Sequence, residues 1–108
     1  MMAFARLSVQ EQAIRGEIVP VRLVILHAME SGFRLDADGR AIAKNVIRIA
    51  TCRYAAREVW RAELSSGIAA NPYFEFFIRA DVSGDIEVVW EDDNLEKGAI
   101  RQRIEVAG

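Results

Sequence analysis

The chain has 108 residues, of which 52% are hydrophobic and 28% are charged. This composition is typical of one globular domain, and we expect a single domain over residues 1–108. Fourteen basic against sixteen acidic residues give a formal net charge of -2, which argues against nucleic acid or an anionic membrane as the main partner. No apolar run approaches the about 20 residues of a membrane span, and residues 1–10 lack the apolar segment of a signal peptide, so export would need outside help.

The first part of the chain favours strands. Residues 5–9 alternate weakly and predict a short edge strand, followed by a polar connection at residues 10–12. Residues 17–29 are rich in β-branched side chains and predict the longest strand, with Pro20 placing its start at an edge or a bulge. A loop is predicted over residues 30–40, with a tight turn at Asp38-Gly39. The Asp-x-Asp-Gly sequence there lacks the remaining ligands of a calcium loop, so we interpret it as a turn.

The middle of the chain has a helical alternative, because alanine is common between residues 41 and 62. β-branched and aromatic residues nevertheless favour two strands, 46–54 and 58–64, joined across Ala55-Ala56. The next strand is entered through Asn71-Pro72, since proline and its constraint on the preceding residue direct the chain before the aromatic run begins. Alternation there predicts one buried face and one opposite face. The buried face carries Phe74, Phe76 and Ile78, and the opposite face carries Tyr73, Glu75, Phe77 and Arg79.

Two more strands are predicted near the C-terminus, at residues 86–91 and 100–106, with residues 91–94 as the polar tip of the hairpin between them. About six or seven short strands without a convincing helix predict an all-β, immunoglobulin-like antiparallel β-sandwich. Its predicted aromatic core is Trp60, Phe74, Phe76 and Trp90. One cysteine, Cys52, excludes an internal disulfide.

Few residues suggest chemistry. His27 is the only histidine, and no G-x-S-x-G nucleophile motif is present, so hydrolysis is disfavoured. His27, Met29 and Cys52 are the right donor types for copper, but structural roles are favoured for them. Arg48 and Arg53 would favour a Cys52 thiolate, whereas a mid-strand position favours an inert, buried thiol. We therefore expect no catalytic residue, no metal and no cofactor.

Several segments in order resemble the SoxZ family, the Z subunit of the sulfur-oxidation carrier protein. They are H-A-M-E-S-G-F-R (27–34), G-R-A-I-A (39–43), E-V-W-R-A-E-L (58–64) and G-I-A-A-N-P-Y-F (67–74), and similar flanking segments extend the resemblance over residues 5–106. The chain departs from the family where Ala28 and Ala43 replace proline and where Ala55-Ala56 replaces Asn-Gly.

The resemblance implies a non-catalytic, immunoglobulin-like subunit. Such subunits pair with SoxY, whose C-terminal Gly-Gly-Cys-Gly-Gly arm carries covalent sulfur intermediates between periplasmic enzymes. Residues 105–108 contain no such arm, which matches the Z subunit and not the carrier subunit. The resemblance also implies heterodimer formation, transient contacts with other sulfur-oxidation enzymes, and a periplasmic location reached by co-export with a signal-bearing partner. Two alternatives stay open: a free-standing immunoglobulin-like interaction module, and a small thiol protein acting through Cys52.

Partner-binding residues are predicted on two grounds. Exposed aromatic side chains on a charged sandwich mark contact surfaces, so Tyr73 and Phe77 are the predicted anchors. Met29 and Arg34, together with Asn71 and Pro72, are weaker candidates for guiding the partner's arm, because the resembling segments concentrate there. The alternative for Tyr73 and Phe77 is that the other sheet or a loop covers them.

Overall fold

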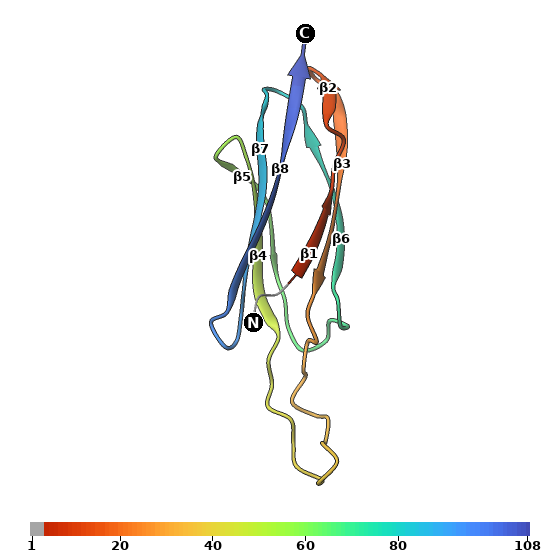
Figure 1. The fold of residues 1–108 in the computed structure, drawn as a ribbon, viewed down its shortest axis with the longest axis vertical. Coiled ribbons are helices and arrows are strands. Elements are labelled where there is room, and N and C mark those ends of the chain that lie inside the picture. Colours follow the sequence, from red (N-terminus) through yellow and green to blue (C-terminus); the bar gives the residue numbers. More distant parts are fainter. Residues whose placement is uncertain (1–3) are drawn as a thin grey trace.

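The computed structural model describes residues 4–108 as two packed β-sheets (Figure 1). Its strands are β1 (Phe4–Ser8), β2 (Gln12–Ile14), β3 (Ile18–Leu26), β4 (Ile47–Tyr54), β5 (Arg57–Glu63), β6 (Tyr73–Arg79), β7 (Gly84–Asp92) and β8 (Lys97–Ala107). The smaller sheet has the order β1-β3-β6, and the larger has the order β2-β8-β7-β4-β5. The predicted all-β sandwich is confirmed. Within residues 4–108, no helix is long and apolar enough to cross a membrane.

One strand was not predicted. The sequence suggested a polar connection at residues 10–12, but its last residue, Gln12, begins β2, which pairs in parallel with β8, whereas the other strand pairings of residues 4–108 are antiparallel. This brings the described chain to eight strands instead of six or seven. Residues 1–3, part of the segment for which the sequence predicts no signal peptide, lie outside the described residues.

The centre of the core is aliphatic. Its fully buried side chains come from both sheets and include Val19, Val21, Leu23, Ile25, Ile47, Ile86, Val88 and Ile104. The predicted aromatic core is only partly right, because Phe76 and Trp90 are buried while Trp60 and Phe74 are half-buried. Trp60 stacks on Phe76 at a centroid distance of 4.5 Å and tilts against Phe74 at 5.1 Å. These rings therefore link β5 to β6, which belong to different sheets.

Pro20 lies where β3 has a neighbour on one side only. The backbone N–H of Ile25 donates to Pro72 O, so odd-numbered residues of β3 bond to β6 and even-numbered residues turn towards β1. The β1–β3 pairing ends at Ser8 opposite Arg22, before it reaches Pro20. The missing N–H of Pro20 therefore leaves no ladder bond unmade, which confirms the predicted edge position. The strand itself is shorter than the predicted 17–29, and it ends before His27.

The β4–β5 hairpin turns at Ala55 and Ala56, whose φ angles are 50° and 68°. Positive φ at both central residues matches a tight hairpin turn for which Asn-Gly is the usual choice. The β-branched residues on both sides of this turn thus favour strands, although alanine is common in the segment. The predicted strands are confirmed here, and the helical alternative is wrong.

A long excursion between β3 and β4 projects from one end of the sandwich, at the bottom of Figure 1. We call residues 29–46 the finger. Its two sides meet at isolated bridges between Glu30 and Asn45 and between Leu35 and Ala41. At its tip, Asp36 Oδ1 accepts hydrogen bonds from the N–H groups of Asp38 and Arg40, which confirms the predicted turn. The described molecule is consequently elongated, with extents of 61 × 19 × 18 Å.

Candidate interaction surface

The side of the β1-β3-β6 sheet that faces away from the core carries most of the large exposed apolar side chains of those strands. We call it the outer sheet face. Its members from β3 and β6 pair in rows across the two strands: Ile18 with Arg79, Pro20 with Phe77, Arg22 with Glu75, and Val24 with Tyr73. At its far end Leu26 pairs with Phe4 of β1. Alternation along each strand places all these side chains on one side.

Tyr73 and Phe77 are 57% and 61% exposed on this face. The alternative that the other sheet or a loop covers them is therefore wrong. Phe4, Ile18 and Leu26 are also exposed. An apolar surface that gathers aromatic side chains in this way is what a protein-contact surface requires.

One ion pair divides the outer sheet face. Arg22 Nε lies 2.7 Å from Glu75 Oε2, with both side chains partly exposed. The row of Val24 and Tyr73 lies on one side of this pair, and the row of Pro20 and Phe77 lies on the other. An exposed ion pair of this kind contributes little to the stability of the fold. Its main effect is to favour partner surfaces that carry complementary charges.

Two of the other predicted contact residues, Met29 and Pro72, are buried and do not contribute to this surface. Met29 is only 5% exposed, and its Sδ accepts a hydrogen bond from Ile47 N at 3.3 Å. Pro72 is buried. Asn71 adopts φ 53° and locks the end of β3, because its Oδ1 accepts from His27 N while its own N–H donates to His27 O. Met29, Asn71 and Pro72 thus have structural roles here.

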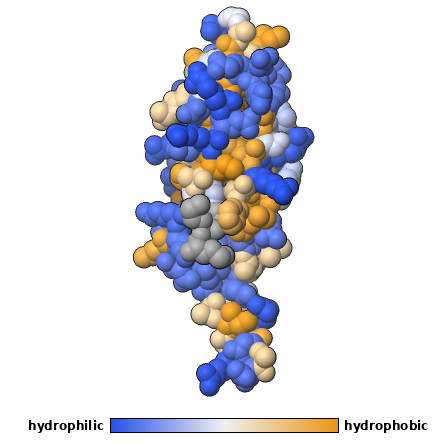
Figure 2. All heavy atoms as spheres, in the orientation of Figure 1, coloured by the Kyte–Doolittle hydropathy of each residue, from blue (hydrophilic) through white to orange (hydrophobic). Residues whose placement is uncertain are grey.

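Arg34 lies apart from the anchors, on the finger. It is exposed and its Nη2 lies 2.5 Å from Glu30 Oε1. This hydrogen bond lowers the pKa of Glu30 and raises that of Arg34. Beside it, Phe33 is 87% exposed and Leu35 is 60% exposed. Figure 2 shows hydrophobic side chains on the finger among hydrophilic ones, and others in the middle of the sandwich.

A buried His–Asp pair at the base of the finger was not predicted. His27 Nε2 lies 3.1 Å from Asp92 Oδ2, and His27 Nδ1 accepts a hydrogen bond from Met29 N. The imidazole is therefore assigned as the neutral tautomer that carries its proton on Nε2. The predicted polar tip at residues 91–94 is wrong for Asp92, which is 3% exposed.

Asp92 also holds the turn that follows β7. Its Oδ1 accepts from the backbone N–H groups of Asn94 and Glu96 at 2.9 and 3.0 Å. Burial raises the pKa of Asp92, but the hydrogen bonds from His27, Glu96 and Asn94 outweigh it, so the pKa lies below the usual value. The charged carboxylate is consequently a structural element of this end of the sandwich.

These contacts bear on the copper hypothesis. Both ring nitrogens of His27 already have protein partners. Among residues 4–108, no three His, Cys, Asp or Glu side chains group together in a way that could hold a metal ion. The other two donors named in the sequence are also engaged in the core: Met29 Sδ accepts a hydrogen bond from Ile47 N, and Cys52 is fully buried.

Cys52 is an inert core residue. It is fully buried on β4, and burial raises the pKa of its thiol to about 12. Arg48 and Arg53 do not produce the thiolate that their nearness in sequence suggested: Arg48 pairs with Glu91, and Arg53 is exposed. At neutral pH the thiol is protonated and inaccessible, which argues against a thiol protein acting through Cys52.

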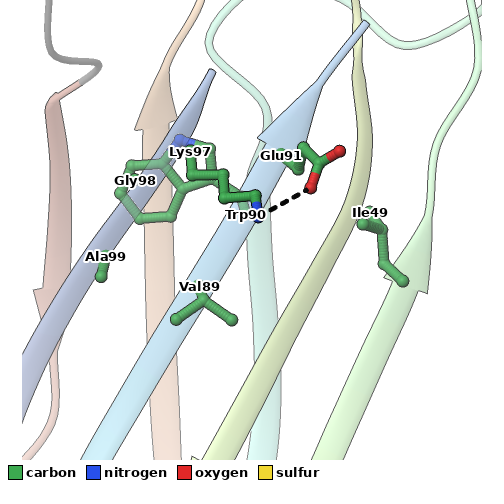
Figure 3. Close-up of a pocket in the computed structure, with 7 residues that line it drawn as sticks. All are labelled: Ile49, Val89, Trp90, Glu91, Lys97, Gly98 and Ala99. Atoms are coloured by element: carbon green, nitrogen blue, oxygen red, sulfur yellow. Dashed lines mark ion pairs between the residues drawn. The ribbon is translucent and has the colours of Figure 1, made fainter. Parts of the chain in front are cut away.

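A shallow hollow of about 490 Å³ lies on the larger sheet, on the side away from the core (Figure 3). Its lining includes Ile49, Val89 and Ala99, with Lys97 and Glu91 paired at 3.7 Å on its rim. Its lining residues comprise no nucleophile with an adjacent base, and the charged groups are already paired. The hollow is therefore a less developed candidate than the outer sheet face.

Together, the topology and the exposed apolar face define an immunoglobulin-like β-sandwich that presents a surface for protein contact. The family model described as "Sulphur oxidation protein SoxZ" matches residues 7–102, and the chain belongs to this family. Membership gives it a role in the sulfur-oxidation system. The resemblance recognised in the sequence is thereby confirmed. No curated protein sequence gave a significant match.

Solved structures support the fold. Superoxide reductase (neelaredoxin) from Ignicoccus hospitalis has a TM-score of 0.74 at 16% identity, over 97% of this chain and 82% of that one. A putative superoxide reductase from Thermotoga maritima gives 0.76 at 14% identity, over 96% and 86%. The sulfur carrier protein SoxY from Chlorobium limicola f. thiosulfatophilum gives 0.66 at 12% identity, over 96% and 79%. At these identities the likeness concerns the fold alone.

Proposed function

We propose that the chain is the non-catalytic subunit of a heterodimeric sulfur carrier, in which a SoxY-like partner carries the sulfur intermediates on the cysteine of its C-terminal arm. The observation that carries the proposal is the outer sheet face, which residues 4–108 leave open and on which Tyr73 and Phe77 are more than half exposed in a SoxZ-family sandwich. Aromatic anchors of this kind dominate binding energy at protein interfaces.

The state of Cys52 supports assigning the sulfur chemistry to the partner. A sulfur carrier needs an accessible thiolate to form an adduct, whereas Cys52 is buried and its pKa is raised to about 12. The solved SoxY structure has a similar fold, so the two subunits of the proposed carrier would be two sandwiches facing each other. Because SoxY-type carriers work between periplasmic enzymes, the proposal includes co-export with the partner and transient contacts with other enzymes of sulfur oxidation.

The test is reconstitution with the SoxY-like protein of the same organism. We expect an equimolar complex in native mass spectrometry and, after exposure to a sulfur donor, adducts on the partner's cysteine with Cys52 unmodified. Stoichiometric adducts on Cys52 in the native complex would overturn the non-catalytic assignment. Failure to form the complex would leave the chain as an interaction module for a different protein.

A further inference from the structure

The central rows of the outer sheet face, on β3 and β6, have an order of side chains that is complementary to itself, whereas the exposed Arg6 and Arg79 lie towards its margins. A charged row, Arg22 and Glu75, lies between two apolar rows. Within the charged row the positive side chain is always on β3 and the negative one on β6. An arrangement that places β3 of one copy over β6 of another, with the charged rows in register, therefore sets opposite charges face to face.

This arrangement results from a two-fold axis that lies in the plane between the two faces, runs parallel to the strands and passes midway between β3 and β6. Each row then meets the same row of the other copy with the strands exchanged. Arg22 faces the second copy's Glu75 twice over, without a like-charge contact in that row. In the row beyond it, Tyr73 faces Val24, and the two contacts are again identical by symmetry.

We propose that, in the absence of its partner, the chain forms a homodimer through the outer sheet faces with this symmetry. The row of Pro20 and Phe77 completes the contact, because the exposed ring of Phe77 then lies over Pro20 of the second copy. Ile18 in the last row faces the aliphatic stem of Arg79. Side chains of β1 lie at the margin of this arrangement.

The available area fits a stable dimer. A phenylalanine or tyrosine side chain buries about 200 Å² when covered. With Tyr73 57% and Phe77 61% exposed, each can therefore bury more than half of that area. Adding the exposed parts of the surrounding side chains gives on the order of 600–800 Å² per copy, which is close to the share that one partner buries in a standard interface.

The homodimer would occupy the same face that the proposed function assigns to the partner, and to this extent the inference rests on that function. The two assemblies then exclude each other. Free Z subunit would keep its apolar face covered until the partner competes for it, which limits aggregation through an exposed hydrophobic surface.

Sedimentation equilibrium of the isolated chain, at micromolar concentrations and low salt, tests the dimer. We expect a reversible monomer–dimer equilibrium in the native chain. Arg22→Glu and Glu75→Arg, each alone, should weaken dimerisation by roughly tenfold or more, because like charges then face each other. An equimolar mixture of the two variants should regain dimers, since every charged contact between unlike copies is attractive again. The matched control is Arg103→Glu, which alters an exposed pair on β8 and should leave association unchanged.

A native chain that stays monomeric overturns the inference, as does a mixture that dimerises no better than its components. At concentrations low enough for native chain and variants to be monomeric, thermal unfolding of both variants should stay cooperative and close to that of the native chain, because the like charges that each variant sets opposite each other on β3 and β6 are exposed to solvent. This separates lost contacts from lost folding. The proposed function fails differently. A monomer that still binds the SoxY-like partner contradicts only the homodimer, and a homodimer that never binds the partner contradicts only the carrier assignment.

Discussion

Replacing Phe77 with alanine tests the proposed partner surface directly. Its side chain is 61% exposed, so about 120 Å² of a ring of about 200 Å² is available to a partner. At about 25 cal/mol per Å², complete burial of that area would contribute about 3 kcal/mol to binding. Imperfect burial reduces this figure, and we expect a loss of about 2 kcal/mol, which weakens the heterodimer roughly thirtyfold.

The assay is isothermal titration of the variant with the SoxY-like partner, alongside thermal unfolding of the isolated chain. At concentrations at which the isolated chain is monomeric, unfolding should stay cooperative and nearly unchanged, because the removed ring makes little contribution to the core. Val89→Ala is the matched surface control: Val89 is also exposed, on the outward side of β7, and its replacement should leave affinity unchanged.

Phe76→Ala is the matched core control on the same strand. Phe76 is 9% exposed and stacks on Trp60, so its loss should lower the free energy of unfolding by about 3–5 kcal/mol. The reasoning is refuted if Phe77→Ala binds the partner with full affinity. It is also refuted if that variant unfolds like the Phe76 variant, because Phe77 would then be a core residue.

Three further results are expected. Cys52 should resist alkylation in the folded chain at pH 8 and react only in denaturant, because burial raises the pKa of its thiol to about 12. The Cys52→Ser variant should retain partner binding but lose about 1 kcal/mol or more of stability in chemical unfolding, because its hydroxyl would be buried. The depressed pKa of Asp92 contributes stability above about pH 4 that is lost as the pH falls through its folded pKa, and Asp92→Asn should remove that part of the acid dependence of the unfolding midpoint. Gly98→Ala should destabilise by about 1–3 kcal/mol in chemical unfolding, because its Cβ would lie 2.2 Å from the Trp90 ring, whereas Gly67→Ala meets no atom within 4 Å and should be neutral.

The strands that alternation could predict are those with one clearly buried face. In β6 the period of two separated Phe76 and Ile78 from Tyr73 and Phe77, and the structure buries the first two and exposes the others. β2 could not be found in this way. It has three residues, and its existence depends on parallel pairing with β8, about 90 residues later in the chain, which no local pattern records.

The interaction surface was only partly predictable for a related reason. Alternation identified Tyr73 and Phe77, but the contributions of Phe4 and Ile18 depend on how β1, β3 and β6 align, and register across strands is a tertiary property. Met29 and Pro72 were chosen because resembling segments concentrate around them. The structure shows that such a concentration can also mark buried residues that shape the base of a loop.

The His27–Asp92 pair supplies hydrogen bonds at the base of the finger. The finger leaves the last residues of β3 and returns to β4, so its base needs partners for polar groups that no strand pairing satisfies. His27 supplies them in two directions, accepting from Met29 N and donating to Asp92, while Asp92 in turn holds the N–H groups of Asn94 and Glu96. In the sequence, Asp92 is one of several acidic residues in a row and looks like part of a solvated turn. Its role becomes visible only in the fold, because β7 places Asp92 within hydrogen-bonding distance of His27, 65 residues earlier in the chain. At this end of the core, a carboxylate with hydrogen-bond donors on both oxygens stands where an apolar side chain would otherwise pack.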